Sequence, residues 1–392
     1  MVETPLDQFP PELSSPTDQL RPESFFAEMH DDAPIRWDET RGCWDVFGYE
    51  AVQTVAADDE QFSVRMDANP DFDRSAGDPP LLSRSMLHAD PPRHDELRGV
   101  VDRWFTPEAL AEFRPSIQQT AVALLDEAMA SADGPGARAT VDLVDEFAYP
   151  LTVETIAEVL GVPPRDRQRV REWTRFAMAA GGDDGSLGSL VAYFEALADR
   201  RRDGPADDLA TDAAVADHLS GDELRDTFMV VLLGGLSTTY LIANAVWSLV
   251  EADAVAAVRP DRDALKRAID ETLRYRSPVQ AHNRYAVERT TVADATVEPG
   301  DKLCLWYAAA NHDPTVFDDP ATFDLDRDAA PHLSFGTGTH FCLGARLARL
   351  ETTVALETLL DRANGIAVDV DAMEPTGSML LWGPSTMPVS LD

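Results

Sequence analysis

Lysine is almost absent from this chain of 392 residues. Only Lys266 and Lys302 are lysines, so arginine supplies nearly all of the 33 basic residues, which are outnumbered by 70 acidic residues. The formal net charge of −37 argues against nucleic acid and anionic membranes as partners, because both would be repelled. The same charge opposes compact folding unless salt screens it, and the Debye length falls to about 3 Å at 1 M salt.

Cysteine is also scarce. Cys43, Cys304 and Cys342 are the three cysteines, an odd number without the spacing of a disulfide framework. We therefore expect a reducing location, the cytoplasm. The residues after Met1 are acidic and proline-rich, with no basic cluster ahead of an apolar run. This start predicts neither a signal peptide nor a membrane anchor.

One uncharged run, Thr227–Val250, is long enough to cross a bilayer. Glycines and hydroxyl side chains interrupt it near its middle, at 234–239, and Asn244 follows. We interpret the run as a long buried helix in a globular core.

No repeat or low-complexity linker divides the chain, so we expect one large domain over residues 1–392. Proline punctuates the first ninety or so residues, where Cys43–Phe47 is strand-like. Helical spacing dominates from Pro92 to Arg276, and short strands follow from Val279 to Asp301. The helices that we expect are Glu108–Met129, Pro150–Leu160, Asp166–Met178, Gly188–Arg202, Asp222–Leu249 and Ala345–Leu360. Surface loops are predicted at Gly181–Gly185 and Asp203–Pro205.

The most informative segment is the glycine-rich loop Phe335–Gly344. It places Cys342 just before a predicted helix, where free N–H groups and the helix dipole favour a thiolate. Glycines at 336, 338 and 344 would let a flat ligand approach the sulfur. A lone thiolate suits one axial bond to iron better than a zinc site. The alternative is a buried structural cysteine in a glycine turn.

This loop resembles the haem-binding loop of the cytochrome P-450 family, whose core is Phe-x-x-Gly-x-His-x-Cys-x-Gly, and it matches every fixed position. The resemblance implies the cytochrome P-450 fold, mostly α with small β-sheets, and haem b with Cys342 as the iron ligand. The acid-rich, lysine-poor composition resembles that of proteins from extreme halophiles. We therefore expect a soluble enzyme of the bacterial or archaeal type from a halophile.

A Glu-x-x-Arg motif at Glu271 and Arg274 supports the resemblance. In the family this pair is buried and is joined by an arginine at the place of Arg327, which implies a structural ion network beneath the haem. The alternative is an ordinary exposed pair, which would contribute little to stability.

Haem propionates need cationic or hydrogen-bonding partners if they are buried. The segment His88–Arg98 resembles the family's propionate-binding helix, with His94 and Arg98 four residues apart on one face. Arg284 and His340 stand at the spacings of the family's other propionate ligands. Taken singly, each of these four is more typical of an ordinary surface residue.

The distal motif of the family, small-Gly-x-acid-Thr, aligns with Gly234–Thr238. The paired glycines, including Gly235, would leave room for dioxygen, and Thr238 would hydrogen-bond the activated oxygen and open the helix. Ser237 replaces the usual acid, so proton delivery is expected to be slower or to use another route. The alternative is that Ser237 belongs to a polar patch on a core helix.

Substrate-contacting positions follow from the resemblance. They are the segments Arg65–Met86 and Phe176–Tyr193 together with Val230, Leu233, Val279, Leu380 and Leu381. The single positions are apolar, which favours an apolar or amphipathic substrate, although each could equally be a core residue.

The resemblance implies a monooxygenase that inserts one oxygen atom from O2 into an organic substrate, with electrons from a separate ferredoxin or flavodoxin-like donor and its NAD(P)H reductase. Two alternatives are a peroxide-driven oxygenase, dehydratase or isomerase, suggested by Ser237, and a haem-binding sensor or carrier without turnover. We expect a monomer. The donor would dock on the cysteine side against Arg103, Arg346 and Arg349, unless these arginines pair with carboxylates such as Glu351.

Overall fold

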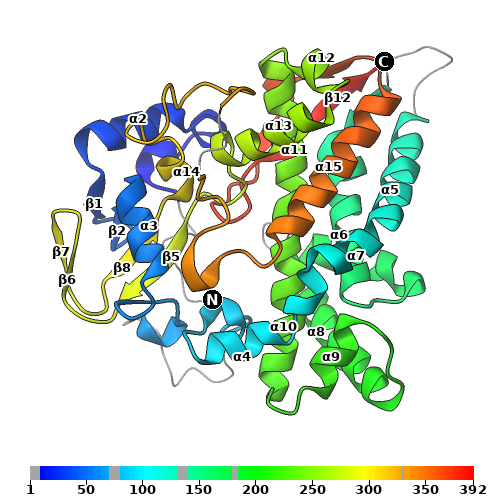
Figure 1. Ribbon diagram of the computed structural model, residues 1–392, viewed down its shortest axis with the longest axis horizontal. Helices are drawn as coiled ribbons and strands as arrows, with labels where there is room; N and C mark the ends of the chain where they lie inside the picture. Colours follow the sequence, from blue (N-terminus) through cyan, green and yellow to red (C-terminus); the bar gives the residue numbers. More distant parts are fainter. Residues whose placement is uncertain (1–8, 70–79, 131–138, 179–183, 328–330) are drawn as a thin grey trace.

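The computed structural model describes residues 9–69, 80–130, 139–178, 184–327 and 331–392. Within them, long helices occupy one side of the molecule and a small sheet with its covering helices occupies the other (Figure 1). The fold expected from sequence, mostly helical with small sheets, is confirmed. The loop that carries Cys342 runs between the two sides and leads into α15 (Ala345–Arg362).

The larger sheet has the strand order β1-β2-β8-β5-β3, and all neighbours are antiparallel except β2 and β8. Its strands are β1 (Ile35–Asp38), β2 (Cys43–Val46), β8 (Lys302–Leu305), β5 (His282–Ala286) and β3 (Phe62–Ser63). The strand expected at Cys43–Phe47 is therefore present. Two nearby helices, α2 (Glu23–Asp32) and α3 (Tyr49–Ala57), were not expected, because each shows only two or three turns of apolar spacing.

The helical side contains every helix expected from sequence, with bounds shifted by a few residues. The helices on this side, besides α15, are α5 (Pro107–Met129), α6 (Tyr149–Val159), α7 (Pro164–Met178), α8 (Asp184–Asp203), α9 (Leu209–Val215), α10 (Gly221–Gly235), α11 (Ser237–Glu251), α12 (Val255–Val258) and α13 (Arg262–Tyr275). Of these, α9, α12 and α13 were not among the helices expected. Side-chain caps explain several of the starts. Thr106 Oγ1 accepts from Ala109 N before α5, and Ser220 and Glu223 form a capping box on α10.

The uncharged run forms the centre of the helical side, as expected, but it is not one helix. α10 ends at Gly235 and α11 begins at Ser237, with Leu236 between them. Leu236 N bonds to Leu233 O and Thr239 N bonds to Leu236 O, which are tighter i→i−3 bonds. The stretch Gly221–Glu251 is long and apolar enough to span a membrane, and 67% of its apolar window is buried inside the protein. That burial agrees with a core helix.

Short elements connect these parts. They are η2 (Pro11–Leu13), α1 (Pro16–Leu20), η3 (Met66–Ala68), η4 (Met86–His88), α4 (Arg93–Gly99), η5 (Asp102–Phe105), the π-helix η6 (Leu143–Ala148), α14 (Tyr307–Ala310), η7 (Gly338–His340) and η8 (Val370–Ala372). Small sheets pair β6 (Thr290–Val292) with β7 (Ala295–Val297), β10 (Glu374–Pro375) with β11 (Pro384–Thr386), and β12 (Pro388–Leu391) with β4 (Ala139–Asp142) and β9 (Ile366–Val368).

The two predicted loops have different outcomes. Gly204 and Pro205 are not helical, as expected, but Asp203, the first residue of that predicted loop, is the last residue of α8. The other loop was wrong at its end, because Asp184 and Gly185 form the first turn of α8, and its residues 181–183 lie outside the described residues.

Candidate haem-thiolate site

Cys342 lies at the end of a tight loop whose glycines are required by geometry. Gly336 and Gly338 both have φ +69°, a conformation that side chains rarely adopt. A Cβ on Gly338 would also lie 2.8 Å from the Cα of Ala57 on α3, so the loop packs directly on that helix. Cys342 N donates to Phe335 O at 2.9 Å, which closes the loop just before α15. The side chain of Cys342 is exposed.

The pKa of the Cys342 thiol differs from the expectation that the helix start favours a thiolate. Burial raises its pKa, and this effect outweighs the backbone N–H groups of Gly344 and Ala345 and the charges of Arg98 and Arg349, which lower the pKa. Although part of the side chain is accessible, dense protein around the sulfur disfavours the charged form. The predicted donors are present, but the helix start does not by itself produce a thiolate. Coordination to a metal ion deprotonates such a thiol.

The four residues predicted to bind propionates, which come from α4, β5 and the cysteine loop, lie close to one another. The rings of His94 and His340 are in contact, with centroids 4.5 Å apart. Arg98 Nη1 donates to Phe341 O at 2.7 Å, so α4 is tied to the cysteine loop. After burial, the charges of Arg284 and His94 are the largest influences that lower the pKa of His340, to about 3. The cluster therefore has a surplus of positive charge and donors.

Two buried nitrogens of this cluster have no hydrogen-bond partner among the described residues, Arg284 Nε and His340 Nε2. The remaining nitrogens of Arg284 donate to the carbonyls of Asn283 and Ala56, at 3.0 and 3.3 Å. An unpaired buried donor is costly, and a carboxylate, which only accepts hydrogen bonds, is its natural complement. The residues present thus fit the two carboxylates of a haem.

The Glu-x-x-Arg motif forms the buried network that was expected. Arg274 donates to both carboxylate oxygens of Glu271, at 2.7 and 2.9 Å, and Arg327 Nε donates to Glu271 Oε1 at 3.1 Å. Glu271 is 5% exposed and Arg274 is 2% exposed. Arg274 also donates to the carbonyls of Asn311, Pro320 and Thr322. The network therefore ties α13 to the chain that leads toward the cysteine loop.

The two glycines of the distal motif differ in their surroundings. A Cβ on Gly235 would lie 3.0 Å from Ile156 Cγ1, so this glycine permits close packing of α10 on α6. A Cβ on Gly234 would meet nothing within 4 Å. Ser237 Oγ donates to Gly234 O at 3.1 Å. Thr238, in contrast, is buried, so the accessible hydroxyl is that of Ser237.

One buried acid was missed by sequence reasoning. Glu351 lies on α15, is 1% exposed, and its Oε1 has no partner among the described residues. Burial raises the pKa of its carboxyl well above the usual value, while a hydrogen bond from Thr155 lowers it less. The signal was available, because Leu347 and Val354, four before and three after, place Glu351 on the apolar face of the helix.

The predicted substrate positions fall into two groups. Trp382 N bonds to Pro278 O and Gln280 N bonds to Met379 O, which brings Val279 beside the segment of Leu380 and Leu381. Val230 and Leu233 are half-buried on α10. Of the two predicted segments, residues 70–79 and 179–183 lie outside the described residues. Phe176 is described and is exposed.

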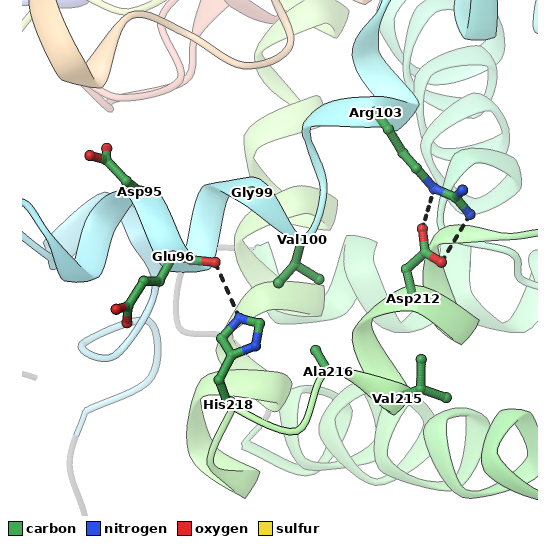
Figure 2. A pocket seen from close by; sticks show the side chains of 9 residues that line it. All are labelled: Asp95, Glu96, Gly99, Val100, Arg103, Asp212, Val215, Ala216 and His218. Atoms are coloured by element: carbon green, nitrogen blue, oxygen red, sulfur yellow. Dashed lines mark hydrogen bonds and ion pairs between the residues drawn. The ribbon is translucent and has the colours of Figure 1, made fainter.

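The arginines expected to dock an electron donor are not equally available. Arg103 lines a surface groove of about 660 Å³ between α4 and α9, where Arg103 Nη2 donates to Asp212 Oδ1 at 2.9 Å (Figure 2). Arg349 donates to Asp270 at 2.8 Å, not to Glu351. Arg346 is exposed and forms no ion pair within the described part of the chain. Of these three arginines, only Arg346 has no ion-pair partner within the described residues, so its charge is the one available to an electron donor.

Comparisons with known proteins agree with this geometry. Residues 257–385 match the family described as cytochrome P-450. The chain is 36% identical over 402 residues to Cytochrome P-450 109 of Bacillus spizizenii, covering 97% of this chain and 94% of the relative. It is 32% identical over 396 residues to 6-deoxyerythronolide B hydroxylase of Saccharopolyspora erythraea, covering 94% and 95%. The crystal structure of substrate-free CYP109E1 from Bacillus megaterium has a TM-score of 0.86 at 31% identity, covering 95% of this chain and 99% of that one.

Proposed function

Because this chain belongs to the cytochrome P-450 family of haem-thiolate monooxygenases, we propose that it inserts one oxygen atom from O2 into an apolar or amphipathic organic substrate. The observation that carries the proposal is the meeting of Cys342 with a cluster of unpaired cationic and imidazole donors. Haem b would supply oxygen activation when bound. The protein's residues bind the cofactor, exclude water and move protons.

Cys342 would hold the haem iron through its sulfur. Its loop is held by the bond from Cys342 N to Phe335 O and by the packing of Gly338 on α3. Backbone N–H groups of Gly344 and Ala345 would remain as donors to the ligating sulfur. His94, Arg98, Arg284 and His340 would bind the propionates. Arg284 Nε and His340 Nε2, which have no partner among the described residues, support this assignment.

Proton delivery would use hydroxyls and one buried acid rather than an acid beside Thr238. Ser237 Oγ carries one proton and lies at the break between α10 and α11. Burial raises the pKa of Glu351 well above its usual value, which favours the protonated form, and α15 packs against α11. Glu351 can thus hold a proton that Ser237, as a hydroxyl of ordinary acidity, cannot supply. Thr238 Oγ1 would complete the route.

The substrate class, the electron donor and the cellular location are inferred from the apolar positions and from the surface charge. Val279, Leu380 and Leu381 form an apolar corner that favours an apolar or amphipathic substrate. A separate ferredoxin or flavodoxin-like protein would supply electrons on the side of Arg346. The net charge of −37 supports a halophilic cytoplasm as the location.

A peroxide-driven reaction is the second candidate, and Ser237 is the observation that favours it. Without an acid at this position, two-electron reduction of O2 would couple poorly to product formation, whereas peroxide already carries its protons. Turnover with peroxide alone, at a rate that NAD(P)H and ferredoxin do not exceed, would favour this candidate.

The test is the carbon monoxide spectrum of the reduced holoprotein. The wild type is expected to show the red-shifted band of a thiolate-ligated haem, and Cys342→Ala is expected to lose it. Cys304→Ala is the matched control, because Cys304 is buried in the sheet and should leave the band unchanged. A band that survives Cys342→Ala would refute the ligand and the proposed function with it.

A further inference from the structure

Two buried threonines on the helical side have hydroxyls without a partner. Thr152 on α6 is 0% exposed and Thr239 on α11 is 1% exposed, and neither Oγ1 has a hydrogen-bond partner among the described residues. A threonine in a helix commonly donates to the carbonyl oxygen four residues earlier. This bond is made by Thr174, Thr227, Thr272, Thr352, Thr353 and Thr358. Because Thr152 and Thr239 do not make it, their hydroxyls are available to a partner outside their own helices.

A third helix supplies a buried carboxyl to the same region. Glu351 on α15 is 1% exposed, and its Oε1 has no partner among the described residues. The hydroxyl of Thr155 hydrogen-bonds the carboxyl of Glu351. Thr155 is three residues after Thr152, so both side chains leave the same face of α6. The carboxyl therefore lies within one helical turn of Thr152.

The contact between Gly235 and Ile156 sets the register of the two unpaired threonines. α10 packs on α6 at this contact, and α11 continues against η6, which precedes α6, so the two helical stretches run in opposite directions. Thr239 follows Gly235 by about one turn, and Thr152 precedes Ile156 by about one turn. Thr239 is therefore beside Thr152, and α15 packs against α11 on the same side.

The oxygen seam, as we call this cluster where α6, α11 and α15 meet (Figure 1), consists of Thr152, Thr155, Thr239 and Glu351. Burial raises the pKa of Glu351 and the bond from Thr155 lowers it less, and no cationic side chain of the described residues contributes. An ionised carboxylate buried without a counter-charge is costly. All the side-chain ligands are oxygens, which hard cations prefer. One carboxylate balances one positive charge, so the seam suits a monovalent cation.

We propose that the oxygen seam binds an alkali cation, Na⁺ or K⁺, through the carboxylate of Glu351 and the three threonine hydroxyl oxygens. The site goes beyond the proposed function, because it needs no haem. The cation and a proton neutralise the same carboxylate, so binding of the cation releases the proton. A bound cation therefore closes the proton route through Glu351, and this second effect rests on the proposed function.

The experiment measures the melting temperature of the holoprotein by circular dichroism in NaCl, KCl and choline chloride, each at about 1 M. The three salts screen surface charge equally, but choline is too large to enter a buried site. Wild type should melt about 3 °C higher in the salt whose cation fits than in choline chloride, the shift expected at about 100-fold saturation of a site in the folded state. The comparison of NaCl with KCl identifies the ion.

Four variants locate the site. Glu351→Gln removes the charge and should abolish the difference between the salts, and Thr239→Val removes one ligand and should reduce it. Glu108→Gln at an exposed position is the control for the charge. Thr358→Val is the control for the hydroxyl, because Thr358 is buried and already bonds Val354 O at 2.8 Å. Both controls should keep the wild-type difference.

Proton release is measured with a pH dye in weakly buffered choline chloride. Addition of the fitting cation should release up to about one proton per chain from wild type and none from Glu351→Gln.

Three results would overturn the inference. Equal melting of wild type in the three salts would mean that the seam holds a buried water only. A difference that persists in Glu351→Gln would place the cation elsewhere. Equal proton release from wild type and Glu351→Gln would separate the cation from this carboxyl. In each case a wild-type carbon monoxide band would leave the proposed function intact.

Discussion

Ser237 Oγ donates a hydrogen bond to the carbonyl oxygen of Gly234, 3.1 Å away, across the break between α10 and α11. Gly234 lies in the last turn of α10, so the bond links the first residue of α11 to the end of α10. It also gives Ser237 the structural role of holding the helix end while it stands in the place of the family's usual acid.

Ser237→Asp tests whether missing charge at this position limits proton delivery. A carboxylate there should raise the fraction of consumed NAD(P)H that appears as oxygenated product, although it gives up the bond to Gly234 O. Product and NADPH are measured together with a good substrate. Ser237→Ala is the control and should not improve coupling. No gain in Ser237→Asp would assign proton delivery to another route, such as one through Glu351.

Glu351→Gln should stabilise the protein at neutral pH. Because burial raises the pKa of Glu351 in the folded state, the unfolded chain loses this proton first as pH rises above the ordinary glutamate pKa. The folded state then binds more protons than the unfolded state, so the free energy of unfolding falls with rising pH until the folded pKa is passed.

Urea unfolding of wild type and Glu351→Gln between pH 4 and pH 8 measures this effect. The range begins near the ordinary glutamate pKa of about 4.3, where the unfolded chain starts to lose the proton. The variant's advantage should be largest at the alkaline end and shrink toward pH 4. Glu108→Gln, at an exposed position on α5, is the control. A constant difference across the range would contradict a raised pKa for Glu351.

Glu271→Gln should destabilise the fold strongly. Removing this carboxylate leaves Arg274 buried without its counter-charge and breaks the contact with Arg327. Breaking one partner of a buried pair costs about 3–5 kcal/mol in the free energy of unfolding. Chemical denaturation measures the change. Asp263→Asn, which removes the exposed pair with Lys266, should have little effect. Equal effects of the two variants would refute a buried network.

Thermal stability should rise steeply from dilute buffer to molar potassium chloride. The net charge of −37 already counts every arginine and lysine, so the excess carboxylates repel one another and salt screens that repulsion. Melting followed by circular dichroism at increasing salt measures the rise. A melting temperature that stays constant over this range would contradict the halophilic origin.

Arg346→Gln should slow electron transfer from a bound acidic ferredoxin. Arg346 is exposed and without an ion pair in the described residues, so its charge is available to orient a partner. High salt screens long-range steering, so the effect should appear in reduction within the complex rather than in association. Arg103→Gln should matter less, because Asp212 already pairs with Arg103. Unchanged reduction by Arg346→Gln, measured by stopped flow, would place docking elsewhere.

The amino-acid sequence by itself determined where the cysteine and the glycine turns of the loop lie and where the long helices lie. Both are local properties: Cys342, Gly336 and Gly338 lie within a few residues of one another, and helical spacing is visible over three or four turns. The Glu271–Arg274 pair was visible for the same reason. Short helices such as α2 and α3 were missed because their stability comes from contacts with the sheet rather than from their own pattern.

Only the tertiary structure decided what surrounds each of these residues. Gly235 meets Ile156, Arg349 pairs with Asp270 instead of Glu351, and His340 joins a cluster supplied by α4, β5 and the cysteine loop. These neighbours are dozens to hundreds of residues apart in the chain. Desolvation and ion pairing depend on distance in space, so the acidity of Cys342 and Glu351 could not be read from the residues beside them.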